Sequence, residues 1–179
     1  MTSVRIRLAA RSDREGIRAV HLRAFPEGEG RLVANLASDL LDEETQPETI
    51  ALVAETGGGV VGHIAFSPVT ADTRGDWRGY ILAPLGVLPE HHGAGIGSML
   101  VEGGIELLSG KMAGVVLVYG DPRYYGRFGF SAEAAAGFVP PYALRHPFGW
   151  QARVLHGAGP NGRVVRISCV RPLRDPALW

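Results

Sequence analysis

Hydrophobic residues recur along this chain with two periods, one typical of strands and one of helices. They alternate with polar residues in VRIRLAA, residues 4–10, which predicts a strand. They then recur every three or four residues in about 14–25 and 31–41, which predicts two helices separated by PEGEG at 26–30. The buried face of the first helix is expected to contain Ile17, Val20 and Ala24. Its N-terminal cap is expected at Ser12 and Asp13.

The middle of the chain predicts an antiparallel meander followed by one crossover. Three apolar segments, at 50–55, 60–69 and 79–88, have strand length, and TGGG joins the first two as a hairpin. A helix over about 96–109 comes next, and the continuous apolar run at 114–120 predicts a strand covered on both faces. The residues expected on the buried side of this helix are Ile96, Leu100 and Leu107.

The last third of the chain predicts shorter elements. Residues 121–130 predict a short helix with Pro122 at its first position and Gly129 near its end. We expect an ordered loop over 131–150, then a closing hairpin of WQARVLH and GRVVRISCV joined by GAGPNG. The order of elements predicts an α/β fold, with a mixed, mostly antiparallel sheet flanked by helices and one β-α-β crossover, in a single domain over 1–179.

Composition and charge limit only the broad class of protein and its partners. The 179 residues are 46% hydrophobic and 20% charged, as is typical of a folded globular domain. Eighteen basic and eighteen acidic side chains cancel, and without a basic stripe we expect no nucleic-acid partner. Because the chain has neither a membrane-length apolar run nor the apolar core of a signal peptide, we expect a cytoplasmic protein with no membrane partner. Its single cysteine, Cys169, is predicted to be a buried strand residue.

The stretch LPEHHGAGIGSML, residues 88–100, places Gly93, Gly95 and Gly97 between a strand and a helix. Glycines allow positive φ and close approach of a ligand, and a helix N-terminus directs unpaired N–H groups at negative charge, so an anion site is predicted. A P-loop requires Lys-Ser or Lys-Thr after the last glycine, whereas Ser98 and a methionine follow here. The G-x-G-x-x-G spacing of dinucleotide-binding proteins does not match either, which weighs against an NAD-dependent oxidoreductase.

The same stretch resembles motif A of the GNAT superfamily of acetyl-CoA-dependent N-acetyltransferases. In that motif a strand ending in hydrophobic-x-Val is followed by a proline and then by [Q/R]-x-x-G-x-[G/A] at the start of a helix. The matching residues are Leu85, Gly86 and Val87, then Pro89, then His92, Gly95 and Gly97. His92 stands where glutamine or arginine is usual, which puts one side-chain contact of the family in doubt.

A second segment carries the resemblance further. GNAT enzymes have an aromatic-Tyr-x-x-x-Gly-Phe segment downstream of motif A, and YYGRFGF at 124–130 matches it. The asparagine that the family has before this segment is not at its usual distance from Tyr125, and Gly-Asp-Pro at 120–122 stands there instead. The chain is most similar to a bacterial subgroup of predicted acetyltransferases of uncharacterised substrate. The resemblance implies the GNAT fold, with the CoA site on the crossover.

The resemblance also implies roles for individual residues. The main-chain amides of 93–98 would hold the CoA pyrophosphate, and a bulge at 85–87 would free N–H groups for the pantetheine arm and the acetyl carbonyl. Tyr125 would be the catalytic general acid, because a phenol with a pKa of about 10 is a suitable proton donor to a departing thiolate. The implied cofactor-binding residues are Leu85, Gly86, Val87, His92, Gly93, Ala94, Gly95, Ile96, Gly97 and Ser98.

The predicted function is transfer of an acetyl group from acetyl-CoA to a primary amine by direct attack in a ternary complex. The alternative is a non-catalytic module of the same fold that binds an acyl-CoA. Since the attacking amine must lose a proton, a general base or a water chain is required, and the sequence does not single one out. The candidates for the base are Glu90, His91, His92, His63 and Glu29.

The acceptor is expected to be a small-molecule or peptide amine. Glu27 and Glu29 lie in the segment between the first two helices, where the family usually lines its acceptor pocket, so they are candidates for contacting a cationic amine. His91 and His92 have no third ligand at metal-binding spacing, and we expect no metal. The oligomeric state stays open, with a homodimer among the alternatives.

Overall fold

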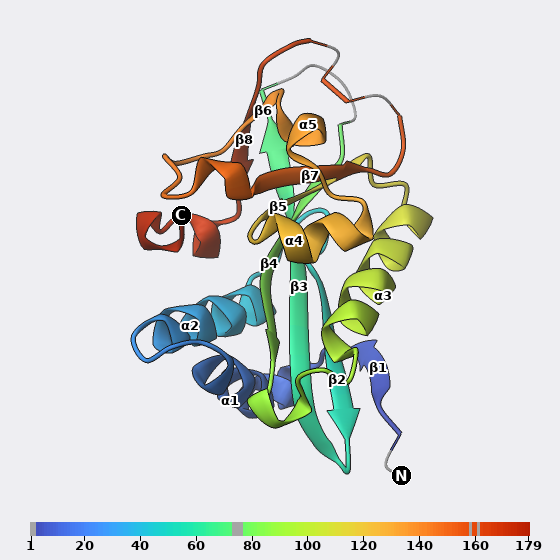
Figure 1. The fold of residues 1–179 in the computed structure, drawn as a ribbon, viewed down its shortest axis with the longest axis vertical. Coiled ribbons are helices and arrows are strands. Elements are labelled where there is room, and N and C mark those ends of the chain that lie inside the picture. The colour runs from blue at the N-terminus through green and yellow to red at the C-terminus, as the bar shows by residue number, and fades with distance from the viewer. Residues whose placement is uncertain (1–2, 73–76, 158, 161) are drawn as a thin grey trace. The chain divides into compact units, whose positions relative to one another are not determined.

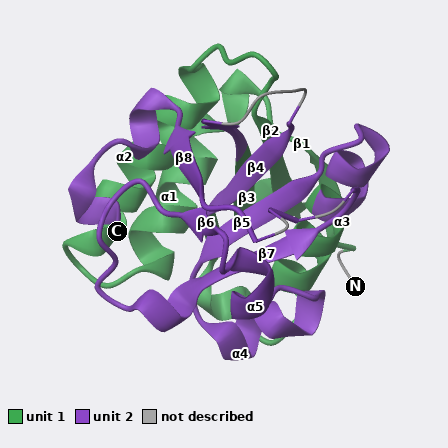
Figure 2. Ribbon diagram, turned by 90° about the horizontal axis from the view of Figure 1, so that it is seen from above, with its two compact units in different colours: residues 1–66, 84–104 green, residues 67–83, 105–179 purple. Residues whose placement is uncertain are grey.

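The computed structural model describes residues 3–72, 77–157, 159–160 and 162–179. Their strands form a mixed, mostly antiparallel sheet flanked by helices, which confirms the predicted fold class (Figure 1). The chain divides into two compact units, Met1–Phe66 with Pro84–Gly104 and Ser67–Ala83 with Ile105–Trp179 (Figure 2). The elements that contribute residues to both units are β3, Gly59–Ala71, β4, Gly79–Val87, and α3, Ile96–Gly110.

The first unit contains an antiparallel ladder of three strands. β1, Arg5–Leu8, pairs with β2, Ile50–Thr56, and β2 pairs with β3. Gly57 and Gly58 turn the chain between β2 and β3 with φ values of 59° and 81°. Glycine reaches this left-handed region without the steric penalty of a Cβ, so the predicted TGGG hairpin is confirmed.

Two helices of the first unit, α1, Arg14–Ala24, and α2, Glu29–Asp42, pack against each other. Their apolar faces follow the predicted period, since Ile17 and Val20 of α1 are fully buried. Ala24 is only partly buried. α2 begins inside PEGEG, two residues earlier than predicted.

The N-cap residue of α1 is Asp13, as predicted, and an ion pair holds its side chain. Asp13 occupies the cap position, but its carboxylate makes no bond to the amides of α1. It accepts the main-chain N–H of Ala10 at 2.8 Å and both guanidinium nitrogens of Arg7 at 2.7 and 2.8 Å. The hydrogen bonds from Arg7 lower the pKa of Asp13, so the carboxylate stays charged and joins α1 to β1.

The second unit contains the parallel strand pair of the crossover. Residues Gly79–Leu82 of β4 pair in parallel with β5, Val115–Tyr119, and α3 lies between these strands in the chain. Residues 115–118 are all buried, as predicted for a strand covered on both faces. Leu107 of α3 is 38% exposed, contrary to prediction, because the buried stripe runs through Leu108 and leaves Leu107 at its edge.

The C-terminal third contains more regular structure than predicted. α4, Pro122–Tyr125, ends in a 3-10 turn that Gly129 terminates with a φ of 79°, as expected. The predicted loop instead includes α5, Ala132–Ala135, and the short strand β6, Phe138–Val139. The side chain of Ser131 starts α5 by accepting the N–H of Ala134 at 3.1 Å, a local cap that the sequence reading missed.

The predicted closing hairpin is wrong, although both of its strands exist. β7, Trp150–Val154, pairs with β5, whereas β8, Val165–Cys169, pairs with β3 and β6. Strand-forming sequences do not specify their neighbours, and each strand here has a partner from an earlier part of the chain. Two positions of the predicted GAGPNG connection, 158 and 161, lie outside the described residues. Cys169 is buried, as predicted.

Across the part of the chain that the structure describes, no helix combines the length and the apolar character needed to cross a membrane.

Candidate functional site

The glycine stretch connects the end of β4 to the start of α3 within the first unit. A 3-10 turn, Pro89–His91, follows the strand, and α3 begins at Ile96. Gly93 and Gly95 both have a φ of 77°, which an L side chain rarely adopts, so glycine is needed at both positions for the course of the main chain. Gly97 already lies inside the helix.

The N-terminus of α3 has main-chain donors available for an anion. The N–H of Met99 donates to the carbonyl of Gly95 at 3.0 Å and is the first amide of the helix with this kind of bond. The four preceding amides have no partner within a helix by its geometry, and they belong to Gly95, Ile96, Gly97 and Ser98. The first turn of α3 carries no acidic side chain that could neutralise these donors, so the residues present fit a phosphate group.

His92 joins the glycine loop to the preceding strand. Its Nε2 lies 2.9 Å from the carbonyl oxygen of Val87, and because a carbonyl only accepts, Nε2 carries the proton and donates. The residue that departs from motif A therefore has a structural contact with the last residue of β4. The contact joins a loop side chain to a main-chain carbonyl five residues earlier, and residue types alone do not indicate it.

The end of β4 lies outside the parallel ladder. β5 pairs with β4 only as far as Leu82, so Leu85, Gly86 and Val87 are not part of that register. Gly86 does not have a positive φ, and conformational freedom is therefore not the reason for a glycine here. A Cβ at this position would lie 2.7 Å from Nδ1 of His21, so a side chain has no room. The predicted bulge at 85–87 stays a prediction.

The candidates for the general base differ in their hydrogen-bond partners and in their exposure to solvent. Glu90 forms a bidentate ion pair with Arg23 at 2.9 and 3.0 Å. A hydrogen bond from its own main chain and those from Arg23 lower the pKa of Glu90 and make it a weak base. Glu29 is exposed at the start of α2, and Glu27, a candidate for contacting the amine and not for the base, is exposed just before the helix. His91 is partly exposed and His92 is exposed.

His63, the remaining candidate, is buried in a pair with a residue that the sequence reading did not consider. Nδ1 of His63, on β3, lies 2.8 Å from Nε2 of His21, on α1. The exposed fractions are 1% for His63 and 0% for His21. Burial lowers the pKa of His21 to about 4 and holds that of His63 well below its ordinary value, so both rings are neutral near pH 7.

Tyr125 lies at the end of α4 in the second unit. The carboxylate of Asp121 caps α4 by accepting the N–H of Arg123 at 2.9 Å. A Cβ at Gly120 would lie 2.4 Å from the ring of Tyr125, and the ring of Phe130 meets that of Tyr125 edge-on at 5.9 Å. Burial raises the pKa of Tyr125, which keeps the phenol protonated at neutral pH.

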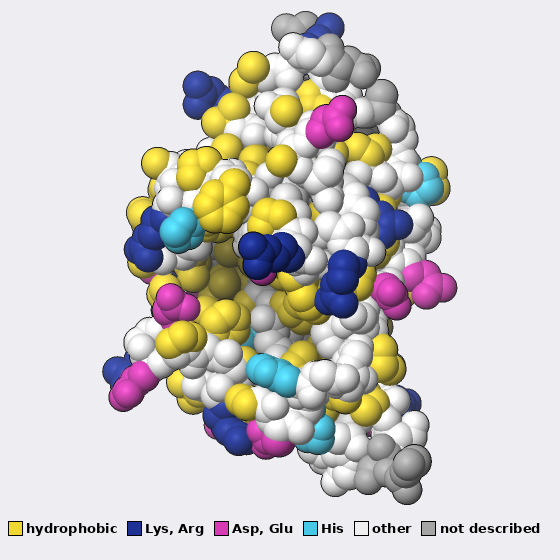
Figure 3. All heavy atoms as spheres, viewed as in Figure 1, with side chains coloured by type: hydrophobic (Ala, Val, Ile, Leu, Met, Phe, Trp, Pro, Cys, Tyr) yellow, Lys and Arg dark blue, Asp and Glu magenta, His cyan; other side chains and the backbone are white. Residues whose placement is uncertain are grey.

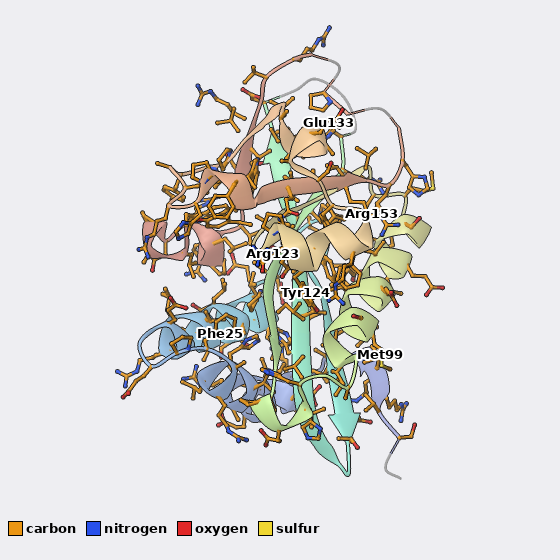
Figure 4. All side chains as sticks on the ribbon, viewed as in Figure 1. Phe25, Met99, Arg123, Tyr124, Glu133 and Arg153 are labelled. Atoms are coloured by element: carbon orange, nitrogen blue, oxygen red, sulfur yellow. The ribbon has the colours of Figure 1, made fainter. Side chains whose placement is uncertain are left out.

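Cationic side chains gather on the face of α4 (Figure 3). Arg127 lies over the ring of Tyr124, with 4.6 Å between the guanidinium carbon and the ring centroid, and Arg153 of β7 donates to the carbonyl of Phe128 at 2.7 Å. Figure 4 shows Arg123 and Tyr124 on α4 and Arg153 on the neighbouring strand. The sequence reading did not single out these arginines, because single charges spread over thirty residues form no recognisable motif.

Known proteins resemble this chain over most of its length. The family described as acetyltransferase (GNAT) domain matches residues 47–132. The uncharacterized N-acetyltransferase YjhQ of Escherichia coli K12 is 35% identical over 178 residues, which cover 94% of this chain and 93% of that protein. The uncharacterized N-acetyltransferase YhbS of the same strain is 37% identical over 134 residues, covering 72% of this chain and 74% of that protein.

Solved structures agree with these sequence relatives. The crystal structure of YhbS from Escherichia coli in complex with CoA has a TM-score of 0.83 and 28% identity, and the match covers 98% of this chain and 94% of that one. A GNAT family acetyltransferase from Brucella melitensis in complex with acetyl-CoA has a TM-score of 0.71 and 31% identity, with 88% and 92% covered. The chain belongs to the GNAT family of acetyltransferases, as motif A and the YYGRFGF segment predicted.

Proposed function

We propose that this acetyltransferase moves an acetyl group from acetyl-CoA to a primary amine of a small molecule or peptide, by direct attack within a ternary complex. The observation that carries the proposal is the start of α3. Gly93 and Gly95 have positive φ just before the helix, whose first four amides have no partner within it. Support comes from two relatives, since the Escherichia coli YhbS structure contains CoA and the Brucella protein contains acetyl-CoA.

Each segment would have a separate task. The amides of 93–98 would hold the pyrophosphate of the substrate, because the N-terminal end of the α3 dipole favours negative charge. The main chain at 85–87, which β5 does not pair, would offer N–H groups to the acetyl carbonyl. Donors fixed there stabilise the charge that develops on the carbonyl oxygen when the amine attacks.

Tyr125 would complete the reaction as the proton donor. The amine nitrogen forms a bond to the acetyl carbon, the C–S bond breaks, and the sulfur takes the electron pair. The phenol of Tyr125, which its raised pKa keeps protonated, then supplies a proton to the sulfur. The amine gives up its own proton to a base or to water.

Calorimetric titration with acetyl-CoA, CoA and NAD tests the binding half of this proposal. We expect saturable binding of both CoA species and none of NAD, and a failure to bind CoA would overturn the proposal. A panel of diverse amines, with release of free thiol as the readout, then tests turnover. Binding of CoA without thiol release for any amine in the panel would favour the alternative, a non-catalytic acyl-CoA-binding module.

A further inference from the structure

The buried His21–His63 pair connects α1 to β3 by a single hydrogen bond between two rings. Nε2 of His21 and Nδ1 of His63 are 2.8 Å apart, and the ring planes meet at 88°. The ring of Phe25 lies 5.9 Å from that of His21, between centroids, and Figure 4 labels Phe25 beyond the end of α1. Burying two imidazoles this completely costs free energy unless their nitrogens have hydrogen-bond partners. The nitrogens outside the His21–His63 bond therefore need to be accounted for.

Nδ1 of His21 has no hydrogen-bond partner among the described residues, and this fixes the tautomer of the pair. A buried N–H group without an acceptor is rare in native proteins because its desolvation is not compensated. The favoured form of His21 therefore has a bare lone pair at Nδ1 and its proton at Nε2. Nε2–H then donates to Nδ1 of His63.

The bare Nδ1 of His21 faces the main chain of Gly86. A Cβ at Gly86 would lie 2.7 Å from Nδ1 and 2.9 Å from Cε1 of His21, so the α-hydrogen in that direction points at the ring. A Cα–H group is a weak hydrogen-bond donor, and a lone pair is a suitable acceptor for it. The contact also leaves no room for a Cβ at position 86 unless the His21 ring moves.

We propose that His21, held by His63, positions the main chain of Gly86 and thereby aims the N–H groups at the end of β4. The inference rests on the proposed function, in which those groups bind the acetyl carbonyl. β3 is the hydrogen-bonded neighbour of β4 on one edge, and the N–H of Leu88 donates to the carbonyl of Val61 at 2.9 Å. On the other edge β5 pairs with β4 only up to Leu82, so no ladder with β5 holds that edge at the end of the strand. The Nδ1 contact supplies a lateral support there, and His63 fixes the angle of the His21 ring.

The charges around the pair are consistent with a neutral support. Asp13 lies near enough to His63 to act on it electrostatically, but the carboxylate is paired with Arg7. A simple packing role for His21 would be filled by any side chain of similar size. A positioning role instead requires an atom with a lone pair at Nδ1 and a donor at Nε2. Substitutions of His21 therefore distinguish the packing role from the positioning role.

Nuclear magnetic resonance of the ligand-free protein tests the support directly. We expect the ¹⁵N shift of His21 Nδ1 to be that of an unprotonated nitrogen, and a coupling across the hydrogen bond to Nδ1 of His63. His21→Gln can keep the donor at Nε2 but has no atom at Nδ1, so the amide signal of Gly86 should shift. His63→Asn can keep an acceptor near the position of Nδ1 of His63. It should therefore shift the Gly86 amide signal less than His63→Leu does. A protonated Nδ1 in the unsubstituted protein, or an unmoved Gly86 signal in His21→Gln, overturns the inference.

The bound substrate provides the second readout. Acetyl-CoA labelled with ¹³C at the carbonyl should show a lower carbonyl stretching frequency when bound, and His21→Gln should move it back toward the free value. We expect CoA affinity to stay within about twofold and kcat to fall about tenfold, because a misaligned donor weakens transition-state stabilisation more than binding. The control is Ile17→Val, another buried substitution on α1 whose side chain belongs to a core cluster with Ala37 and Val53, and it should leave the stretching frequency unchanged.

These measurements distinguish the two proposals. Absence of acetyl-CoA binding by the unsubstituted protein contradicts the proposed function, while the Gly86 amide signal still decides whether His21 supports the strand. Normal acetyl-CoA binding with an equal carbonyl frequency in His21→Gln and the unsubstituted protein overturns the positioning role and leaves the proposed function standing. Gly86→Ala gives an independent check, since the added methyl would meet the His21 ring and should reproduce the frequency change.

Discussion

His92 donates a 2.9 Å hydrogen bond from Nε2 to the carbonyl oxygen of Val87. The bond joins the loop before α3 to the last residue of β4, two segments to which separate parts of the substrate are assigned. It also accounts for the one residue that departs from the family pattern. A histidine here stabilises the loop from within, and its role does not require a direct contact with CoA.

Loss of this bond should weaken binding of CoA. For His92→Ala we expect the dissociation constant to rise about three- to tenfold, since one net hydrogen bond contributes about 1 kcal/mol. His92→Gln, which restores the family residue and a donor, should stay within about twofold. Calorimetry gives both values, with His91→Ala as the control on the neighbouring side chain. An unchanged affinity in His92→Ala would show that the loop holds its form without the bond.

Substitution of Gly95 should strain the loop itself. Gly95→Ala forces an L residue to a φ of 77°, which costs about 1–2 kcal/mol, and we expect CoA affinity to fall about five- to thirtyfold. Gly110→Ala is the matched control, because Gly110 lies at the end of α3 without a positive φ and with open space around its Cα. It should leave affinity unchanged. Equal affinities for the two variants would contradict the role assigned to Gly95.

Removal of the Tyr125 hydroxyl should affect turnover and spare binding. For Tyr125→Phe we expect kcat to fall about 10²- to 10⁴-fold, the usual contribution of a positioned general acid, with acetyl-CoA affinity within about twofold. Tyr124→Phe, on the adjacent residue, should keep most of its activity. Thiol release with an accepted amine measures both. Full activity in Tyr125→Phe removes this residue from the proposed mechanism.

The His21–His63 pair should make stability depend on acid pH. Burial lowers the pKa of His21 from 6.5 to about 4, so the unfolded chain binds a proton below pH 6.5 that the folded chain does not accept until about pH 4. The free energy of unfolding should therefore be highest above pH 6.5 and fall by about 3 kcal/mol toward pH 4, at about 1.4 kcal/mol for each pKa unit. The lowered pKa of His63 acts in the same direction.

Chemical denaturation over this range measures the effect. His21→Gln removes one titrating group and should flatten the dependence, whatever its effect on stability near neutral pH. A denaturation midpoint that stays constant between about pH 7 and pH 4 would mean that the pair is not buried in its neutral form.

Local sequence determined the elements whose signals lie within a few neighbouring residues. Three features follow from the conformational preferences of single residues: the positive φ values of Gly93 and Gly95, the proline that opens α4, and the glycine that ends the 3-10 turn after α4. Hydrophobic period then placed α1, α2 and the central strands. These features, together with motif A and YYGRFGF, were enough to identify the family.

Tertiary structure decided the contacts between residues far apart in the chain. β8 pairs with β3 and β6 because the fold brings the hydrogen-bonding edges of these strands together. The sequence of a strand does not specify which strand it pairs with. The same holds for the pairing of His21 with His63, 42 positions apart, and for the glycine at position 86. The sequence shows only that position 86 is a glycine in a segment predicted to bulge. The fold supplies the reason for the glycine, because the imidazole ring of His21 occupies the space where a side chain would lie.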